Sequence, residues 1–418
     1  MASDVSGVRP ATSRRFVRRT LPLLLVLPVL AGLAGAFLIP PDGDGGGAVP
    51  VAQGSVGGGF HPIAGTFVAD ETRLDGCTTE PACFEQAFGN VAFRQGPRVA
   101  LGLFAERLTT DPVVERGCHR ITHFIGSAAL ERFDGDVAKT FTQGSPVCVS
   151  GYYHGILERA FLGISTRAGL ARAAKELCVG AGRRRGFLDY QCRHGLGHGL
   201  MIQTGYDLPV ALDVCAQLGS GWDRKACAGG AFMENINTQF GFRSPWLDDE
   251  NPLDPCERVD VADARSCYLR ASWRILVLSD GSHAETAAAC ARLGRWAQTC
   301  FQGYGRDVAE HARYEASRIR PLCRLAAKAE GECLHGAART IANASGMPGV
   351  RPAGRLCAGA SNRYRDRCYA GVGLVLGLLH PTSSTRAAAC ARLSRVHAAA
   401  CSSAAAREVA WDGKNAWG

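Results

Sequence analysis

The sequence predicts an all-α protein of disulfide-stapled helical-hairpin repeats, either an α-solenoid or an α/α toroid, behind an N-terminal membrane segment. Three observations predict this fold class. One uncharged segment near the N-terminus is long enough to cross a bilayer. The 418 residues include 18 cysteines, an even and high number. Beyond residue 170 these cysteines form pairs that recur at the period of a helical repeat.

The N-terminal residues predict the compartment. Residues 1–19 are basic, and residues 20–40 contain the apolar run LPLLLVLPVLAGLAGAFLIP, which predicts a transmembrane anchor or a signal peptide. Because basic flanks stay in the cytoplasm, we expect the bulk of the chain to be extracytoplasmic. The segment AGA fits a signal-peptide cleavage site, whereas an apolar length of about 19 residues suits a retained anchor. A single-pass protein of the cell membrane and a secreted protein therefore both remain open.

Residues 41–66 are rich in glycine and proline and predict a flexible linker, and residues 67–418 predict an extracytoplasmic, cysteine-rich helical-repeat domain. Outside the cytoplasm, an even number of cysteines indicates disulfides. The net charge of +9 is not arranged as a basic stripe interleaved with aromatic residues. The run Arg183-Arg184-Arg185 lies beside glycines and predicts a solvated loop. We therefore expect no nucleic acid partner.

The cysteine pairs define the repeat. Their separations run from 10 to 14 residues, and the second members recur every 33 to 40 residues. Each unit predicts a helix that ends near the first cysteine, a short turn, and a second helix that starts at the second cysteine. The pairs are Cys178 and Cys192, Cys215 and Cys227, Cys256 and Cys267, Cys290 and Cys300, Cys323 and Cys333, Cys357 and Cys368, and Cys390 and Cys401.

Four further cysteines precede these units. Cys118 and Cys148 resemble starts of second helices without a local partner, so a bond between the two is one option. Cys77 and Cys83 are close enough to form a bridge of their own. Spacing does not fix the connectivity of these four.

A glycine follows the second cysteine by three residues in most units. It occurs at Gly195, Gly230, Gly303, Gly336 and Gly371, with Arg270 and Ala404 as the exceptions. Glycine within a helix costs about 1 kcal/mol relative to alanine, so its recurrence predicts close contact between helices. Each disulfide can offset this cost with about 3 kcal/mol.

Five histidines occupy related positions in three successive units. They are His119, His123, His154, His194 and His198. His154 and His198 each follow a second-helix cysteine by six residues, and His123 follows Cys118 by five. Four of the five form two pairs, His119 with His123 and His194 with His198, and a spacing of four residues places both imidazoles of a pair on one helix face. Equivalent positions of neighbouring repeats face each other, so we expect the five side chains to converge on a metal ion.

Two glutamates accompany the histidines. Glu158 lies four residues after His154, and Glu234 lies in the next unit. Imidazole with carboxylate suits a transition metal, and an oxidising compartment favours zinc or copper over iron or manganese. At a zinc ion with an open position, either glutamate would serve as the catalytic base for a bound water.

The sequence leaves the function between two classes. The first is a membrane-anchored extracytoplasmic protein with a His-rich metal site, used in metal-dependent catalysis or metal handling; whether it is an enzyme stays open. The second is a non-enzymatic scaffold whose repeat surface binds a protein or a cell-envelope ligand, with structural histidines. Arg306, Arg339 and Arg407 occupy the histidine-equivalent position in later units and suit an anionic partner. A metal-free catalytic or ligand pocket is the third use of the histidines.

Overall fold

The structure is a computed structural model that describes residues 65–236 and 243–411. The chain divides into two units, Met1–Gly45 and Gly46–Gly418, and every described residue belongs to the second. The predicted basic segment, the membrane segment and the linker up to residue 64 lie outside the described residues. Within the described part, no helix combines the length and apolar character needed to cross a membrane.

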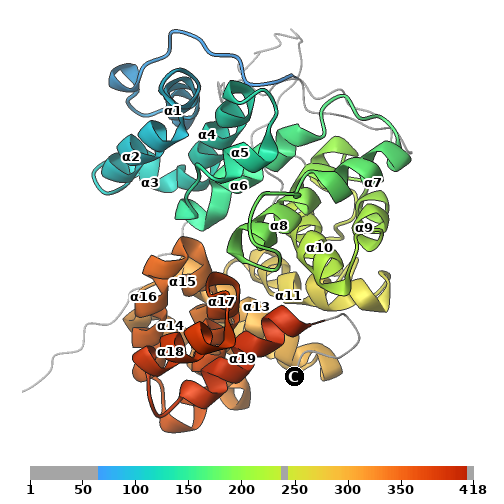
Figure 1. The fold of residues 1–418 in the computed structure, drawn as a ribbon. Coiled ribbons are helices and arrows are strands. Elements are labelled where there is room, and N and C mark those ends of the chain that lie inside the picture. Colours follow the sequence, from blue (N-terminus) through green and yellow to red (C-terminus); the bar gives the residue numbers. More distant parts are fainter. Residues whose placement is uncertain (1–64, 237–242, 412–418) are drawn as a thin grey trace, which may run out of the picture. The chain divides into compact units, whose positions relative to one another are not determined.

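The described residues form an all-helical fold, with no strand in either described range (Figure 1). Nine helices are called the inner helices: seven carry the second cysteine of a repeat pair, and the other two carry Cys118 and Cys148. They are α4 (Cys118–Arg132), α6 (Val147–Ala160), α8 (Phe187–Gln203), α10 (Gly221–Ile236), α11 (Val261–Leu278), α13 (Ala297–His311), α15 (Glu330–Ser345), α17 (Asn362–Leu379) and α19 (Ala398–Ala410), with Cys118 and Cys148 bonded to each other.

The other helices connect the inner ones and are called the outer helices. They are α1 (Pro81–Gln95), α2 (Pro97–Leu108), α3 (Pro112–Arg116), α5 (Val137–Phe141), α7 (Arg167–Glu176), α9 (Leu208–Ala216), α12 (His283–Ala291), α14 (Ala316–Arg324), α16 (Met347–Ala358) and α18 (Ser383–Leu393). Three 3-10 turns, η1 (Leu74–Gly76), η2 (Gly294–Trp296) and η3 (Ala327–Ala329), complete the elements. The unit that contains Cys256 has no outer helix between residues 243 and 260.

All 18 cysteines form disulfides, and the predicted pairing of the seven repeat pairs is confirmed. The connectivity that spacing left open is Cys118 with Cys148 and Cys77 with Cys83. Nine disulfides with no free cysteine indicate an oxidising compartment outside the cytoplasm.

The predicted start of the second helices is wrong by one to two turns. In the seven paired units the inner helix begins before its cysteine; α17, for example, starts at Asn362 although its cysteine is Cys368. The physical reason lies in the bridge. The two Cα atoms of each bridge are 5.3 to 5.8 Å apart, so the outer helix must end beside the body of the inner helix rather than at its first residue.

Inner helices pack against each other in chain order, and the recurring glycines make this contact close. A Cβ atom at Gly230 would lie 1.9 Å from the His194 carbonyl oxygen of the preceding inner helix. At Gly197 it would lie 2.0 Å from the Cys227 carbonyl oxygen of the following one. The predicted role is confirmed at Gly230, Gly303, Gly336 and Gly371, where an added Cβ atom would lie within 2.2 Å of a carbonyl oxygen of the preceding inner helix. Gly195 instead faces the Leu157 side chain at 3.1 Å.

The row of inner helices bends back on itself. Helix α15 contacts α6, and α17 contacts α8, although these pairs are separated by several repeats (Figure 1). The arginine run forms a largely exposed loop, as predicted, and it also joins these distant repeats. Arg183 donates to the Leu378 carbonyl at 2.9 Å, and Arg185 donates to the Val409 carbonyl at 2.7 Å. Backbone carbonyls at the ends of α17 and α19 thus hold this loop in place.

The apolar core lies between inner and outer helices and runs along the array in two main clusters. The first extends from Phe67 to Ala271 and the second from Ile275 to Cys401. Trp222 and Tyr152 are among the largest fully buried side chains. With the core placed there, the opposite faces of the inner helices are left to line interior space with polar side chains.

Candidate metal centre

The five predicted histidines come together from three inner helices. His119 and His123 lie on α4, His154 on α6, and His194 and His198 on α8. The ligand atoms of His119, His123 and His154 lie within 4.8 Å of one another, and the same holds for His154, His194 and His198. The structure therefore contains two triads of nitrogen donors, either of which could hold a metal ion.

His154 belongs to both triads and lies between them. Its ring centroid is 5.6 Å from that of His123 and 4.4 Å from that of His198. The side chain is 2% exposed, and neither ring nitrogen has a hydrogen-bond partner among the residues that the structure describes. A buried imidazole with two unsatisfied nitrogens costs free energy unless another group, such as a metal ion, occupies the positions in front of them.

The other histidines use Nδ1 to contact an oxygen atom. His119 Nδ1 lies 2.7 Å from the Cys148 carbonyl, and His194 Nδ1 lies 3.2 Å from the Ala226 carbonyl. Each Nδ1 must carry the proton to donate to such an acceptor, so each Nε2 presents a lone pair. The backbone thereby fixes the tautomer in which Nε2 is the free ligand atom.

A local left-handed turn sets the carbonyl that orients His119. Residues Cys148, Val149 and Ser150 have φ values of 53°, 56° and 65° at the start of α6. Non-glycine residues rarely adopt this conformation, and each costs about 1–2 kcal/mol. Strained backbone of this kind is common at functional sites. Here the strained residue Cys148 is the one whose carbonyl oxygen contacts His119 Nδ1.

Glu158 and Glu234 contact the remaining two histidines. Glu158 Oε1 lies 2.7 Å from His123 Nδ1, and Glu234 Oε2 lies 2.8 Å from His198 Nδ1. Both carboxylates are buried. Tyr206 donates its hydroxyl to Glu234 Oε1 at 2.8 Å, which holds that carboxylate in position.

Two nitrogen atoms lie unusually close together in the first triad. His119 Nε2 and His123 Nε2 are 3.0 Å apart, while both Nδ1 atoms face oxygen acceptors. If both imidazoles are neutral and protonated at Nδ1, the lone pairs of the two Nε2 atoms face each other, which is unfavourable. Two nitrogen ligands of one tetrahedral zinc ion, each about 2.0–2.1 Å from the metal, lie about 3.3 Å apart. The observed separation is close to that value, so the geometry fits a shared metal ion.

Burial keeps His119, His154 and His194 uncharged. It lowers the pKa of His119 to about 3, with a further contribution from the neighbouring His123. Burial also lowers the pKa values of His154 and His194 well below the ordinary range, and the proximity of His198 adds to both effects. Neutral imidazole is the form that binds metals.

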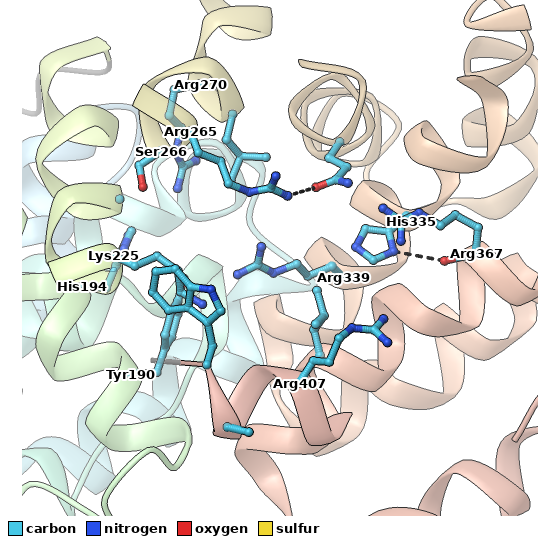
Figure 2. Close-up of a pocket in the computed structure, with 16 residues that line it drawn as sticks. Tyr190, His194, Lys225, Arg265, Ser266, Arg270, His335, Arg339, Arg367 and Arg407 are labelled. Carbon is cyan, nitrogen blue, oxygen red and sulfur yellow. Dashed lines mark hydrogen bonds between the residues drawn. The ribbon is translucent and has the colours of Figure 1, made fainter. Parts of the chain in front are cut away.

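A cavity leads away from the histidines. His154 and His194 line a space of about 90 Å³, which His194 and Tyr190 share with a larger cavity of about 270 Å³. Inner helices from α8 to α19 contribute to the larger cavity, shown in Figure 2. The second triad is therefore connected to a space that a small molecule can fill.

Sequence reasoning missed most residues of this larger cavity. Lys225 and Arg265 line it, and both lie two residues before the second cysteine of their units. The sequence did contain a signal for them. Relative to the second cysteine, the positions two before, two after and six after are spaced four residues apart, so they lie on the same helix face as the histidines. Tyr206, which supports Glu234, carried no signal because it lies outside the repeat register.

Comparison with models of known protein families, with curated proteins and with solved structures finds no match for this chain. The functional proposal therefore rests on the arrangement of the histidines and the neighbouring cavity.

Proposed function

We propose that this chain is an extracytoplasmic, metal-dependent enzyme whose transition-metal centre is held by His119, His123, His154, His194 and His198. The single observation that carries the proposal is the arrangement of the ring nitrogens. Four histidines direct Nδ1 at an oxygen atom, both ring nitrogens of His154 and Nε2 of His198 are buried without a partner among the described residues, and His119 Nε2 faces only His123 Nε2. A metal ion supplies the missing partner.

The two triads support as many as two ions. They share His154, whose Nδ1 and Nε2 are both without a partner, so one nitrogen faces each triad in this proposal. Three nitrogen ligands leave a fourth position of a tetrahedral ion for water or substrate. An all-histidine set suits zinc or copper, and a bound zinc ion lowers the pKa of its water enough to form hydroxide near neutral pH.

The contacts of Glu158 and Glu234 suggest how the two carboxylates act. Each faces the Nδ1 of a histidine, the position from which a carboxylate orients a metal ligand and raises its basicity. Burial raises the pKa of Glu158, but the interaction with His123 outweighs this and lowers the pKa overall. We assign both glutamates to ligand orientation, because each lies on the Nδ1 side of its histidine, across the ring from a metal ion that Nε2 would hold.

The cavity favours catalysis over metal storage or a protein-binding scaffold. A storage site needs no second compartment, whereas a cavity of about 270 Å³ beside the histidines has the size of a small-molecule site. A protein ligand would need a far larger surface. We also propose that residues 20–40 anchor the protein in the cell membrane, with the helical-repeat domain on the outer side.

The test is elemental analysis of the disulfide-intact full chain, purified without a histidine tag or chelator. We expect one or two equivalents of a transition metal in the parent and none in the His154→Ala/His198→Ala variant. The matched control is His283→Ala/His311→Ala, which changes another histidine pair with ring centroids 4.9 Å apart. This control should keep the metal content of the parent.

Two results would contradict the proposal. One is the absence of bound metal in a folded parent that also fails to take up zinc, copper, iron or manganese. The other is equal loss of metal in both double variants, which would show that binding does not depend on the converging histidines.

A further inference from the structure

The larger cavity is strongly cationic. Among the described residues that line it, six side chains carry a basic group and none is acidic. The six are Lys225, Arg265, Arg270, Arg339, Arg367 and Arg407. They come from five inner helices, so folding gathers basic groups that are distant in sequence around one space.

Nearby carboxylates neutralise only part of this charge. Glu408 pairs with Lys225 at 2.9 Å, and Glu332 holds Arg367 through two contacts of 2.7 and 2.8 Å. Within residues 65–236 and 243–411, neither Arg270 nor Arg339 makes a hydrogen bond or an ion pair, and Arg270 Nε is buried without a partner. Both guanidinium groups thus lack a direct ion-pair partner, and Glu310 and Asp307 act on Arg270 only through longer-range electrostatics.

Unpaired charge in such a place is expensive for the fold. Burial lowers the pKa of Arg270 to about 9, with a further effect of the Arg306 charge, and lowers that of Arg265 to about 10, with further effects of Arg339 and Arg367. Guanidinium groups resist deprotonation, so the cost is met by a partner of opposite charge. The shape of the site shows where that partner belongs: Figure 2 places Arg339 toward the side that carries Lys225 and His194.

The remaining lining is apolar and aromatic. Leu269, Leu374, Tyr190 and Trp411 border the same space, and the Trp411 ring lies 4.9 Å from Lys225 Nζ. A ligand for this cavity therefore combines an anionic group with an organic part. Small-molecule sites typically have this mixture of apolar lining and a few charged groups that fix orientation.

We propose that the cavity binds a small phosphorylated organic molecule, with Arg270 and Arg339 as the principal contacts of its phosphate group. Several guanidinium groups on separate helices surround one space, which suits the three terminal oxygens of a phosphate better than a planar carboxylate, for which one arginine suffices. Binding does not require the metal. That the phosphate is part of the substrate rests on the proposed function, because His194 belongs to both sites.

The experiment is isothermal titration of the metal-free, disulfide-intact full chain with inorganic phosphate, pyrophosphate and phenyl phosphate, and with benzoate as the singly charged comparison. We expect phenyl phosphate to bind more tightly than benzoate. Arg270→Gln and Arg339→Gln should each weaken phenyl phosphate binding about 10-fold to 100-fold, the loss typical of a charged hydrogen bond. Arg355→Gln, an exposed arginine of outer helix α16, should leave it unchanged.

Thermal unfolding of the same variants keeps the test independent of folding. Removal of an unpaired cation should leave the melting temperature unchanged or raise it. The proposal is overturned if none of the three phosphates binds the folded metal-free chain at millimolar concentration, or if the three arginine variants bind alike. Phosphate binding that appears only after metal loading would support the metal centre and reject the cationic cavity as its own anion site.

Discussion

At the scale of single residues, Glu234 illustrates how a side chain acts on the metal centre without being a ligand. It accepts from His198 Nδ1 and from the Tyr206 hydroxyl, and it is fully buried. Glu234→Gln keeps the shape but removes the negative charge that favours the Nδ1-protonated tautomer. We expect metal affinity to fall about 10-fold to 100-fold, as measured by competition with a chromophoric chelator.

Tyr206→Phe is a milder change at the same group of side chains. It removes one hydrogen bond to Glu234 and leaves the carboxylate in place, so its effect on metal affinity should be smaller. Equal affinities in the parent and in Glu234→Gln would show that the carboxylate does not tune the histidine.

His335 predicts a pH dependence outside the metal centre. It lies on α15, is 5% exposed, and donates from Nδ1 to the Arg367 carbonyl at 3.1 Å. Burial first, and then the charges of Arg367, Arg339 and Arg265, lower its pKa well below the ordinary value of 6.5. The folded chain therefore stays unprotonated where the unfolded chain binds a proton, so stability is full above about pH 6.5 and falls as the pH drops.

The His335→Gln variant isolates this effect, because the amide keeps a donor for the Arg367 carbonyl but does not titrate. Urea unfolding of both metal-free proteins should show the parent losing about 1.4 kcal/mol per pH unit relative to the variant below pH 6.5. A free-energy difference that stays constant from pH 7.5 to pH 5 would rule out a buried neutral His335.

At the scale of elements, the inner helices depend on glycine at their crossings. A Cβ atom at Gly336 of α15 would lie 1.9 Å from the Gln302 carbonyl oxygen of α13. Gly336→Ala must therefore separate two backbones, and we expect a loss of about 1–3 kcal/mol or more in the free energy of unfolding. The measurement is urea unfolding of the disulfide-intact chain.

Gly102→Ala is the matched control. Gly102 is exposed on outer helix α2, and no atom lies within 4 Å of its added Cβ. Alanine there should stabilise the chain by about 0.5–1 kcal/mol through helix propensity. Destabilisation by both substitutions would point to a general effect of the methyl group rather than to close packing of α13 and α15.

The same elements show what the sequence could predict. Cysteine spacing predicted the seven repeat bridges, and the repeat register predicted that histidines of three successive units converge, because both are local consequences of a helical period. The starts of the inner helices were missed because the bridge geometry, rather than the cysteine itself, decides where the outer helix docks. The contacts of Glu158 with His123 and of Glu234 with His198 depend on how neighbouring helices cross, which no single-unit pattern contains.

At the scale of the whole molecule, the cationic cavity exists because the array bends back on itself. Contacts of α6 with α15 and of α8 with α17 bring Lys225 and Arg265 near Arg367 and Arg407. Curvature of this kind accumulates from small rotations at every repeat. The sequence placed some arginines at histidine-equivalent positions but could not show that the array returns to meet itself.

The metal centre and the cationic cavity lie at different places along the array, so we expect removal of two different disulfides to have different effects. Cys390→Ser/Cys401→Ser loosens the terminal hairpin, whereas Cys118→Ser/Cys148→Ser frees the turn whose carbonyl orients His119. Each double variant should lose about 2–5 kcal/mol of stability. We expect the terminal variant to keep its metal but bind phenyl phosphate more weakly, because α19 carries Arg407. The Cys118→Ser/Cys148→Ser variant should lose metal. Elemental analysis measures the metal content and titration measures phenyl phosphate binding, and identical results for the two double variants would contradict this expectation.

The most direct test of the central claim is an anomalous difference map from crystals of the metal-replete chain, recorded at the absorption edge of the metal found by elemental analysis. The account predicts one or two peaks, each about 2.0–2.1 Å from nitrogen atoms of the histidine triads, with His154 bound in every case. Histidines in the described arrangement without any peak among them, in crystals that do contain the metal elsewhere, would contradict it.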